Sequence, residues 1–564
     1  KGLKSETYFG FNIHNTVRVG KTNDYLAYTI KNPDGETLED RITRYSGHSL
    51  FKMADNYKLM DYYFQRWMFY ERLSYDKTFA NSNLQAAAMY HQTLSYINGI
   101  EEPQRQRSWL GTLNYNLMDK YQFQGVLNYA GNSSFAKDYR SMLNWAVGGA
   151  YVVTEDLITA SNFLNYLKLR VQGGVVGNET YFPNLYDVDR WSSTSTTSTS
   201  TPYAFGPYTS NRWFGTTTEA AVTRAYLSRT GNPILTWEKR AEINGGFDAV
   251  LFNEKVTLGV TYYNWLVDGS LSQTTSNMPY VAGYNGTRPY QNYNQTRYNA
   301  LGTDLTFTHK VGNVILTIGA NATTSKGKRV KYDEPQYRND YQIRTGKASD
   351  AIFGYQYLGK FATDAEAQGG NNTPVQLFDA ELHKDDLKYA DLNKDGFVDE
   401  TDQAVIGYSS PRLYYGINLS LKYKNFDLFV LGAGRALYDL ALTNEYFWNG
   451  WSDDAPNTYS NFVRDNIGGA YPRLTYYKVN NNFVTSDFWL TKGDFFKIQN
   501  VELAYTIPAD VLKFMGSRGI RVYIRGANLL TVSGVKDVDP ESINSGVEYY
   551  PLFRTFSGGV KLNF

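Results

Sequence analysis

Cysteine is absent from the 564-residue chain, so disulfide bonds and thiolate metal sites are excluded. Neither sign of charge is in excess, because 56 Lys and Arg residues are balanced by 55 Asp and Glu residues. The net charge of +1 gives no electrostatic reason to expect nucleic acid as a partner. No uninterrupted apolar run approaches the ~20 residues of a membrane-spanning helix. No signal peptide is visible and the chain begins at Lys1, so we expect a processed or truncated piece.

Tyrosine and glycine are abundant instead, with 49 and 48 residues, and this composition favours strands and turns. In residues 121–129, YQFQGVLNY, apolar and polar side chains alternate. Residues 167–175, 241–251, 314–322, 415–423 and 556–564 repeat the pattern. Alternation with a period of two predicts strands with one apolar and one polar face. We expect about thirteen such strands after residue 108 and about three before it.

The connections between these strands alternate in length. Tight links occur at 117–121, 251–256, 309–313, 423–426 and, slightly longer, 507–519. Long polar links occupy about 176–237, 267–298, 324–412, 432–494 and 532–552. Alternating lengths place all short links at one end of the sheet, which predicts an all-β, transmembrane antiparallel β-barrel with long extracellular loops. We divide it into N-terminal barrel strands and loops at 1–107 and C-terminal barrel strands at 108–564.

A soluble β-sandwich, lectin or propeller array would also show alternation and stays open as an alternative. Strands of about ten residues favour the barrel, because a tilted strand needs that length to cross a bilayer. Charged residues on the polar face suit a wet lumen, and aromatic residues near strand ends suit the two membrane interfaces.

Five ordered segments resemble one known family: YLKLRVQGGVVGN (166–178), a segment at 232–264 beginning NPILTWEKR, a segment at 391–431 beginning DLNKDGFVDETD, DFFKIQNVELAYTIP (494–508) and IRVYIRGANLLT (520–531). They are similar to the barrel half of the SusC/RagA family of TonB-dependent outer-membrane transporters. The resemblance covers about residue 110 to the end.

This resemblance implies a 22-stranded barrel in the outer membrane of a Gram-negative bacterium, and we expect that its N-terminal plug and some strands are absent from this chain. It implies import of oligosaccharides or peptides, driven through TonB by way of the missing N-terminal part. A SusD-like lipoprotein lid is the implied partner, and a dimer of transporter–lid pairs is an accompanying expectation. A surface adhesin or autotransporter-like barrel, which binds without importing, is the alternative. A secreted carbohydrate-active enzyme is a third hypothesis.

Residues 391–402, DLNKDGFVDETD, match the spacing of a calcium-binding loop. The expected ligands follow the template positions, with a glycine at the sharp turn: Asp391, Asn393, Asp395, Phe397 (through its carbonyl), Asp399 and Asp402. Oxygen-only ligands suit a hard cation, and calcium is the cofactor we expect. No flanking helices are evident, so we expect a staple that orders a long link without a core of its own. An acidic turn that binds no metal is the alternative.

Aromatic residues next to carboxylates in the long links are candidates for substrate binding, because sugar rings stack on aromatic faces. The candidates are Tyr446, Trp448, Trp451, Asp453, Trp191, Tyr284 and Tyr290. Packing between loops, or contact with the lid protein, would equally account for them.

Catalysis finds little support in the chain. The five histidines are scattered and none lies in a metal-spacing motif. No GxSxG, Walker or HExxH motif occurs. We therefore expect a protein that is not an enzyme.

Overall fold

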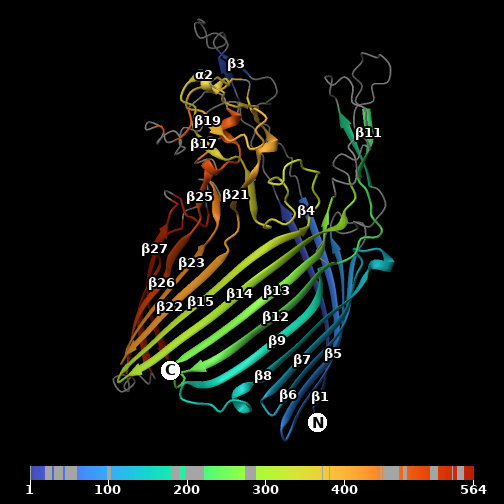
Figure 1. Ribbon diagram of the computed structural model, residues 1–564. Coiled ribbons are helices and arrows are strands. Elements are labelled where there is room, and N and C mark those ends of the chain that lie inside the picture. The colour runs from blue at the N-terminus through green and yellow to red at the C-terminus, as the bar shows by residue number, and fades with distance from the viewer. Residues whose placement is uncertain are drawn as a thin grey trace.

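The computed structural model is built almost wholly of β-strands (Figure 1). It describes residues 2–18, 28–30, 42–44, 60–97, 103–178, 190–196, 222–273, 288–370, 372–379, 381–444, 447–448, 469, 471–473, 479–508, 519–535, 538–542 and 552–563. The one α-helix in these ranges is the single turn α2 (Asp364–Ala367). No helix among them is long and apolar enough to cross a membrane.

Sixteen strands form one large antiparallel sheet in chain order, with β1 and β28 at its two edges. Three of them precede residue 100 and thirteen follow it, which agrees with the strand numbers expected from alternation. The fold class is confirmed. The strands are β1 (Leu3–Arg18), β4 (Met60–Phe79), β5 (Ser82–Ile97), β6 (Gln104–Leu117), β7 (Tyr121–Asn132), β8 (Ser141–Val152), β9 (Leu164–Asn178), β12 (Glu238–Leu251), β13 (Val256–Ser272), β14 (Gln291–Val311), β15 (Val314–Lys331), β22 (Leu413–Tyr423), β23 (Phe426–Ala436), β26 (Phe495–Ile507), β27 (Gly519–Ser533) and β28 (Thr555–Asn563).

The tightest turns lie at one end of the sheet and the longest connections at the other, although the link at 133–140 on the long-loop side is shorter than the link at 153–163 on the short-turn side. Both chain ends lie on the short-turn side (Figure 1). At two of the two-residue turns the first residue has a positive φ, 58° at Gly312 and 53° at Lys424. That backbone matches the right-handed twist of the paired strands, so tight hairpins close the sheet at this end.

The outer face of the sheet is apolar and exposed. Leu127, Leu169 and Ile243 are 57%, 47% and 58% exposed although each lies within a strand. Register aligns such residues side by side, as where Leu169 pairs with Tyr151 and with Phe247. A continuous apolar surface of this kind is the lipid-facing side of a barrel wall.

The opposite face carries the charged and amide side chains that alternation assigned to it. Arg170 makes two hydrogen bonds to Asp248, both 3.0 Å long. Farther around the wall, Arg521 bridges Asp427 (2.9 Å) and Glu502 (2.8 Å). Partly exposed ion pairs on this face indicate an aqueous interior.

The connection from β15 to β22 and the connection from β23 to β26 fold together at the long-loop end, and we call their described residues, 332–412 and 437–494, the loop lobe (Figure 1). Small strand pairs organise it: β16 (Ala351–Gly354) with β21 (Ala404–Tyr408), β17 (Tyr357–Lys360) with β19 (Leu387–Tyr389), β18 (Val375–Gln376) with β20 (Phe397–Val398), and β24 (Asp439–Ala441) with β25 (Leu490–Lys492). Two further hairpins, β2 (Tyr28–Ile30) with β3 (Ile42–Arg44) and β10 (Arg190–Thr196) with β11 (Val222–Arg229), also lie beyond this end of the wall.

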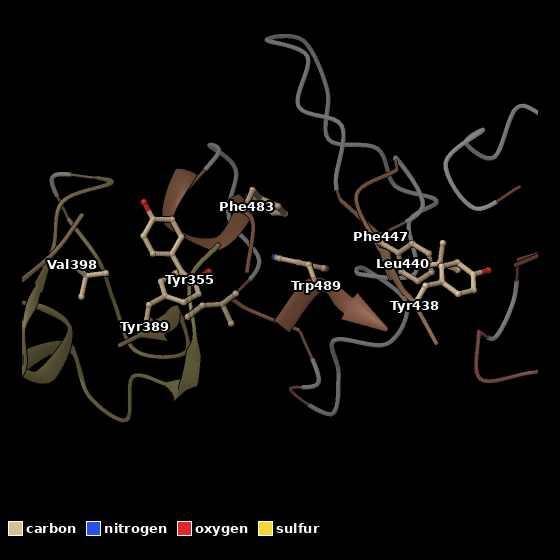
Figure 2. Close-up of a cluster of buried hydrophobic side chains, with 9 residues drawn as sticks. Tyr355, Tyr389, Val398, Tyr438, Leu440, Phe447, Phe483 and Trp489 are labelled. Carbon is tan, nitrogen blue, oxygen red and sulfur yellow. The ribbon is translucent and has the colours of Figure 1, made fainter. Parts of the chain in front are cut away.

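The loop lobe has its own hydrophobic core, contrary to the expectation that its first link lacks one. Tyr355, Tyr389, Val398, Phe483 and Trp489 are among its buried members, and in Figure 2 Trp489 lies centrally in the cluster. Trp489 stacks on Phe483 with ring centroids 6.0 Å apart. The expectation was wrong because apolar side chains of the first link pack on one another, as Phe361, Ala367 and Leu382 do, and are also covered by those of the second link.

Buried amides join the two links as well. Asn482 is 1% exposed, accepts a hydrogen bond from the Leu387 amide (2.9 Å) and donates to Asp386 (2.8 Å). Asp386 is fully buried and is also paired with Arg473 at 3.0 Å. Because buried polar groups are costly when unpaired, this network specifies how the two links meet.

Candidate functional site

A groove with a largely polar lining lies on the inner wall of the barrel part. It has a volume of about 390 Å³ and extends across strands β5 to β13. Its polar lining includes Gln122, Gln124, Lys168, Arg170, Gln172 and Asn244. Amide and cationic side chains in a wet channel can bind hydroxyl or peptide groups as a solute passes.

A glycine keeps part of this groove open. Gly148 faces Gln172 across the β8–β9 pair, and a Cβ built at Gly148 would lie 3.2 Å from the Gln172 Cβ. That separation is tighter than most Cβ contacts, so a larger residue would displace the glutamine.

The 391–402 loop is curled by hydrogen bonds to its own backbone. Asp391 accepts from the amides of Lys394 (2.6 Å) and Gly396 (2.9 Å). These two residues have φ values of 62° and 91°, which is the sharp left-handed turn that a glycine favours. The turn is therefore formed by the chain itself.

Asp402 holds the end of this loop. It is fully buried and accepts hydrogen bonds from the amides of Leu392 (2.8 Å) and Asp399 (3.0 Å). Burial and then the nearby carboxylates, Asp402 and Asp391 first among them, raise the pKa of Tyr341. The loop is thus a concentration of negative charge beside a tyrosine.

All six expected metal-ligating residues lie in this one curled segment. Its neighbours are strands β19 and β21 and a short 3-10 turn at Glu400–Asp402, so no helix pair flanks it, as expected. The oxygen-only donors fit a hard cation chemically. Within the ranges that the structure describes, however, no group of three or more carboxylates or imidazoles converges on one point. The carboxylates instead accept hydrogen bonds within the loop.

The expected substrate residues fall in separate places. Trp448 lies in the loop lobe, with its ring 5.8 Å from that of Phe483 and 5.9 Å from that of Trp489. Tyr290 packs against a different cluster, beside Trp237, and its carbonyl accepts from Asn232 (2.6 Å). The two residues therefore do not form one site.

Trp191 lies in β10, and its side chain is outside the described part. The remaining four also lie outside the described residues: Tyr284, Tyr446, Trp451 and Asp453.

Sequence reasoning did not identify the aromatic residues that surround Trp448. Tyr355, Phe378 and Phe483 line a cleft together with it, although they come from distant parts of the two links. The alternation in 352–357, IFGYQY, was a signal for a short strand there. No local pattern indicates that this strand meets residue 483.

The chain is similar in sequence to several TonB-dependent receptors. The TonB-dependent receptor P3 of Formosa agariphila is 24% identical over 617 aligned residues, covering 100% of this chain and 56% of that protein. The TonB-dependent receptor SusC of Bacteroides thetaiotaomicron is 24% identical, with 81% of this chain and 43% of that protein covered. No protein-family model matches the chain.

The fold agrees with a solved transporter. The RagAB peptide importer in its closed-closed state superposes with a TM-score of 0.67 at 18% identity, covering 100% of this chain and 60% of that chain. This chain spans little more than half the length of the Formosa relative. The relatives are receptors and transporters, which confirms the expectation that the chain is not an enzyme. In sequence the chain is similar to TonB-dependent receptors, SusC among them, and its fold is that of the barrel of the RagAB peptide importer.

Proposed function

We propose that this chain is the wall and loop part of an importer that takes up oligosaccharides or peptides across the outer membrane. TonB supplies the energy through a part of the protein other than the wall described above. A SusD-like lipoprotein covers the long-loop end, and the loop lobe, with Trp448 in it, contacts substrate or lid there.

One observation carries this proposal: the wall has an apolar outer face and a polar inner face. Leu169 and Gln172 belong to the same strand and lie on opposite faces. A wall that meets lipid outside and water inside can surround a polar passage, whereas a soluble sandwich would press its apolar faces together in a dry core. The similarity to TonB-dependent receptors supports import over adhesion.

The test is uptake by cells that carry the intact transporter gene or an in-frame deletion of it. We expect the deletion strain to lose growth on, and accumulation of, one class of oligosaccharide or peptide, and to keep growth on a simple sugar. Loss of TonB should give the same defect. Unchanged uptake across a broad panel, together with loss of attachment to a surface, would favour an adhesin instead.

We also infer that the 391–402 loop binds calcium, held by Asp391, Asn393, Asp395, Asp399 and Asp402 with the Phe397 carbonyl. The oxygen-only ligands at template spacing and the left-handed turn at Gly396 support this inference. The cation would offset the repulsion among the carboxylates and stiffen an already curled loop.

Calorimetric titration of the detergent-purified protein with calcium tests this inference. We expect one site that is lost in Asp391→Asn and kept in Glu381→Gln, a control at a side chain that is 73% exposed and lies outside the loop. Calcium should also slow proteolysis of the loop lobe. Equal heats for wild type and Asp391→Asn would refute a calcium site here.

A further inference from the structure

A cleft of about 700 Å³ lies in the loop lobe beside the 391–402 loop. Its walls are five aromatic side chains that come from both links: Phe353, Tyr355, Phe378, Trp448 and Phe483. Tyr355 and Phe378 meet edge to face, with ring centroids 5.0 Å apart. The rings therefore form a fixed aromatic lining.

The polar part of the cleft is acidic. Asp399 and Glu400 line it, and none of the described residues that line it is a lysine or an arginine. Asp399 accepts hydrogen bonds from the amide (2.8 Å) and hydroxyl (2.7 Å) of Thr401. The Glu400 carboxylate, which is exposed, makes no ion pair or side-chain hydrogen bond within the described part of the chain. Two negative charges thus face the cleft without a basic partner in its walls.

Basic groups line a second cleft, to which Phe353 also belongs. A neighbouring cleft of about 430 Å³ shares Phe353 and Glu400 and is lined by Arg338 and Arg344. The Arg344 guanidinium lies 5.1 Å from the centre of the Phe353 ring, so that ring already takes a cation on one of its sides. The lobe itself therefore shows a cation resting against one of these aromatic rings.

We propose that the aromatic cleft binds an organic cation, an ammonium or guanidinium group carried by a solute that enters the transporter. Aromatic faces attract such a cation through the negative face of the ring. The Glu400 carboxylate complements its charge, and Asp399 adds to it when the 391–402 loop holds no calcium. A neutral sugar could stack on the rings, but it would remove water from both carboxylates without compensating their charge.

Two sources carry this chemistry, a peptide with a lysine or arginine side chain and an oligomer of an amino sugar. The inference rests on the proposed function only in that the cleft meets solutes on their way into the transporter. Binding can be measured without transport, so the two proposals can fail separately.

The experiment is equilibrium binding to the detergent-purified full-length protein, with a calcium chelator present so that metal does not occupy the loop. The probes are N-acetylated, C-amidated Ala-Arg-Ala against the same blocked peptide with citrulline in place of arginine, and a glucosamine oligomer against its N-acetylated form. The two members of each pair differ mainly in whether they carry the positive guanidinium or ammonium charge. We expect at least one charged probe to bind about tenfold or more tightly than its neutral counterpart, and added salt to weaken it.

Variants locate the binding. Glu400→Gln should weaken the charged probe about tenfold and leave the neutral probe unchanged, because this exposed side chain lies at the cleft and outside the core. Trp448→Leu should weaken both probes, and Glu381→Gln should change neither. Equal affinity for charged and neutral probes, or full affinity in Glu400→Gln, would overturn the proposal. If Glu400→Gln cells still import the wild-type nutrient normally, the proposed function stands whatever the binding result.

Discussion

The two faces of β9 give the sharpest test of the barrel. Leu169 lies near the middle of the roughly ten residues that cross the bilayer, counted from the short-turn end of the strand, and its side chain is 47% exposed on the outer face. Its register neighbours, Tyr151 and Phe247, carry no charge that could pair with a cation. Leu169→Arg would therefore leave a guanidinium in hydrocarbon. Arginine near the midplane of a barrel wall costs about 2–4 kcal/mol.

That cost corresponds to a roughly 30- to 900-fold shift in the folding equilibrium. The matched control is Gln172→Arg, three residues along the same strand on the face that lines the polar groove. It should cost less than about 1 kcal/mol, because the new charge stays in water.

Both variants are refolded into lipid vesicles, and the free energy of unfolding is measured by urea titration. In cells, the yield of heat-modifiable protein in the outer-membrane fraction gives a second readout. A similar loss for both variants, or a larger loss for Gln172→Arg, would show that the assignment of the two faces is wrong.

Three further predictions concern the loop lobe. Arg412→Lys keeps the charge but loses the paired hydrogen bonds to Asp350 (3.0 and 3.1 Å), so we expect about 1–2 kcal/mol lower stability and faster proteolysis of the lobe. The Lys388 ammonium, 2.7 Å from the Glu366 carboxylate, and then the Ala362 amide lower the pKa of Glu366 from its usual 4.5. Glu366 therefore stabilises the lobe above pH 4.5, and this stabilisation is lost as the pH falls through the lowered pKa. In Glu366→Gln the proteolysis rate of the lobe should depend less on pH below 4.5. Asn482→Asp places a second carboxylate against buried Asp386, and we expect a loss of about 3 kcal/mol or more at neutral pH, measured by the denaturant midpoint of the lobe and partly recovered in acid.

The barrel could be predicted from the sequence because its signal is local. In 121–129 or 167–175, side chains two positions apart lie on the same face of the strand, so the alternation of apolar and polar residues shows which face is which. The tight links show where each hairpin turns. The sixteen-stranded order follows from these signals, since consecutive antiparallel strands pair with one another.

The loop lobe could not be predicted in the same way, because its contacts join residues about a hundred positions apart. Gln376 donates to Asn481 (2.5 Å), and Asn481 donates to the Leu387 carbonyl (2.7 Å). Nothing in PVQLF or NNNF indicates that these amides meet. The 391–402 loop could be predicted only in part. Its turn follows from local spacing, whereas the full burial of Asp402 depends on the surrounding lobe.

The lobe is also joined closely to the wall that supports it. The Arg412 amide donates to the Ala436 carbonyl (3.2 Å), which links the entry of β22 to the exit of β23, and the Ser325 amide donates to the Arg412 carbonyl (3.1 Å). Strands β24 and β25 then bring the two ends of the second link together. Backbone hydrogen bonds therefore tie both links of the loop lobe to the strands from which they emerge.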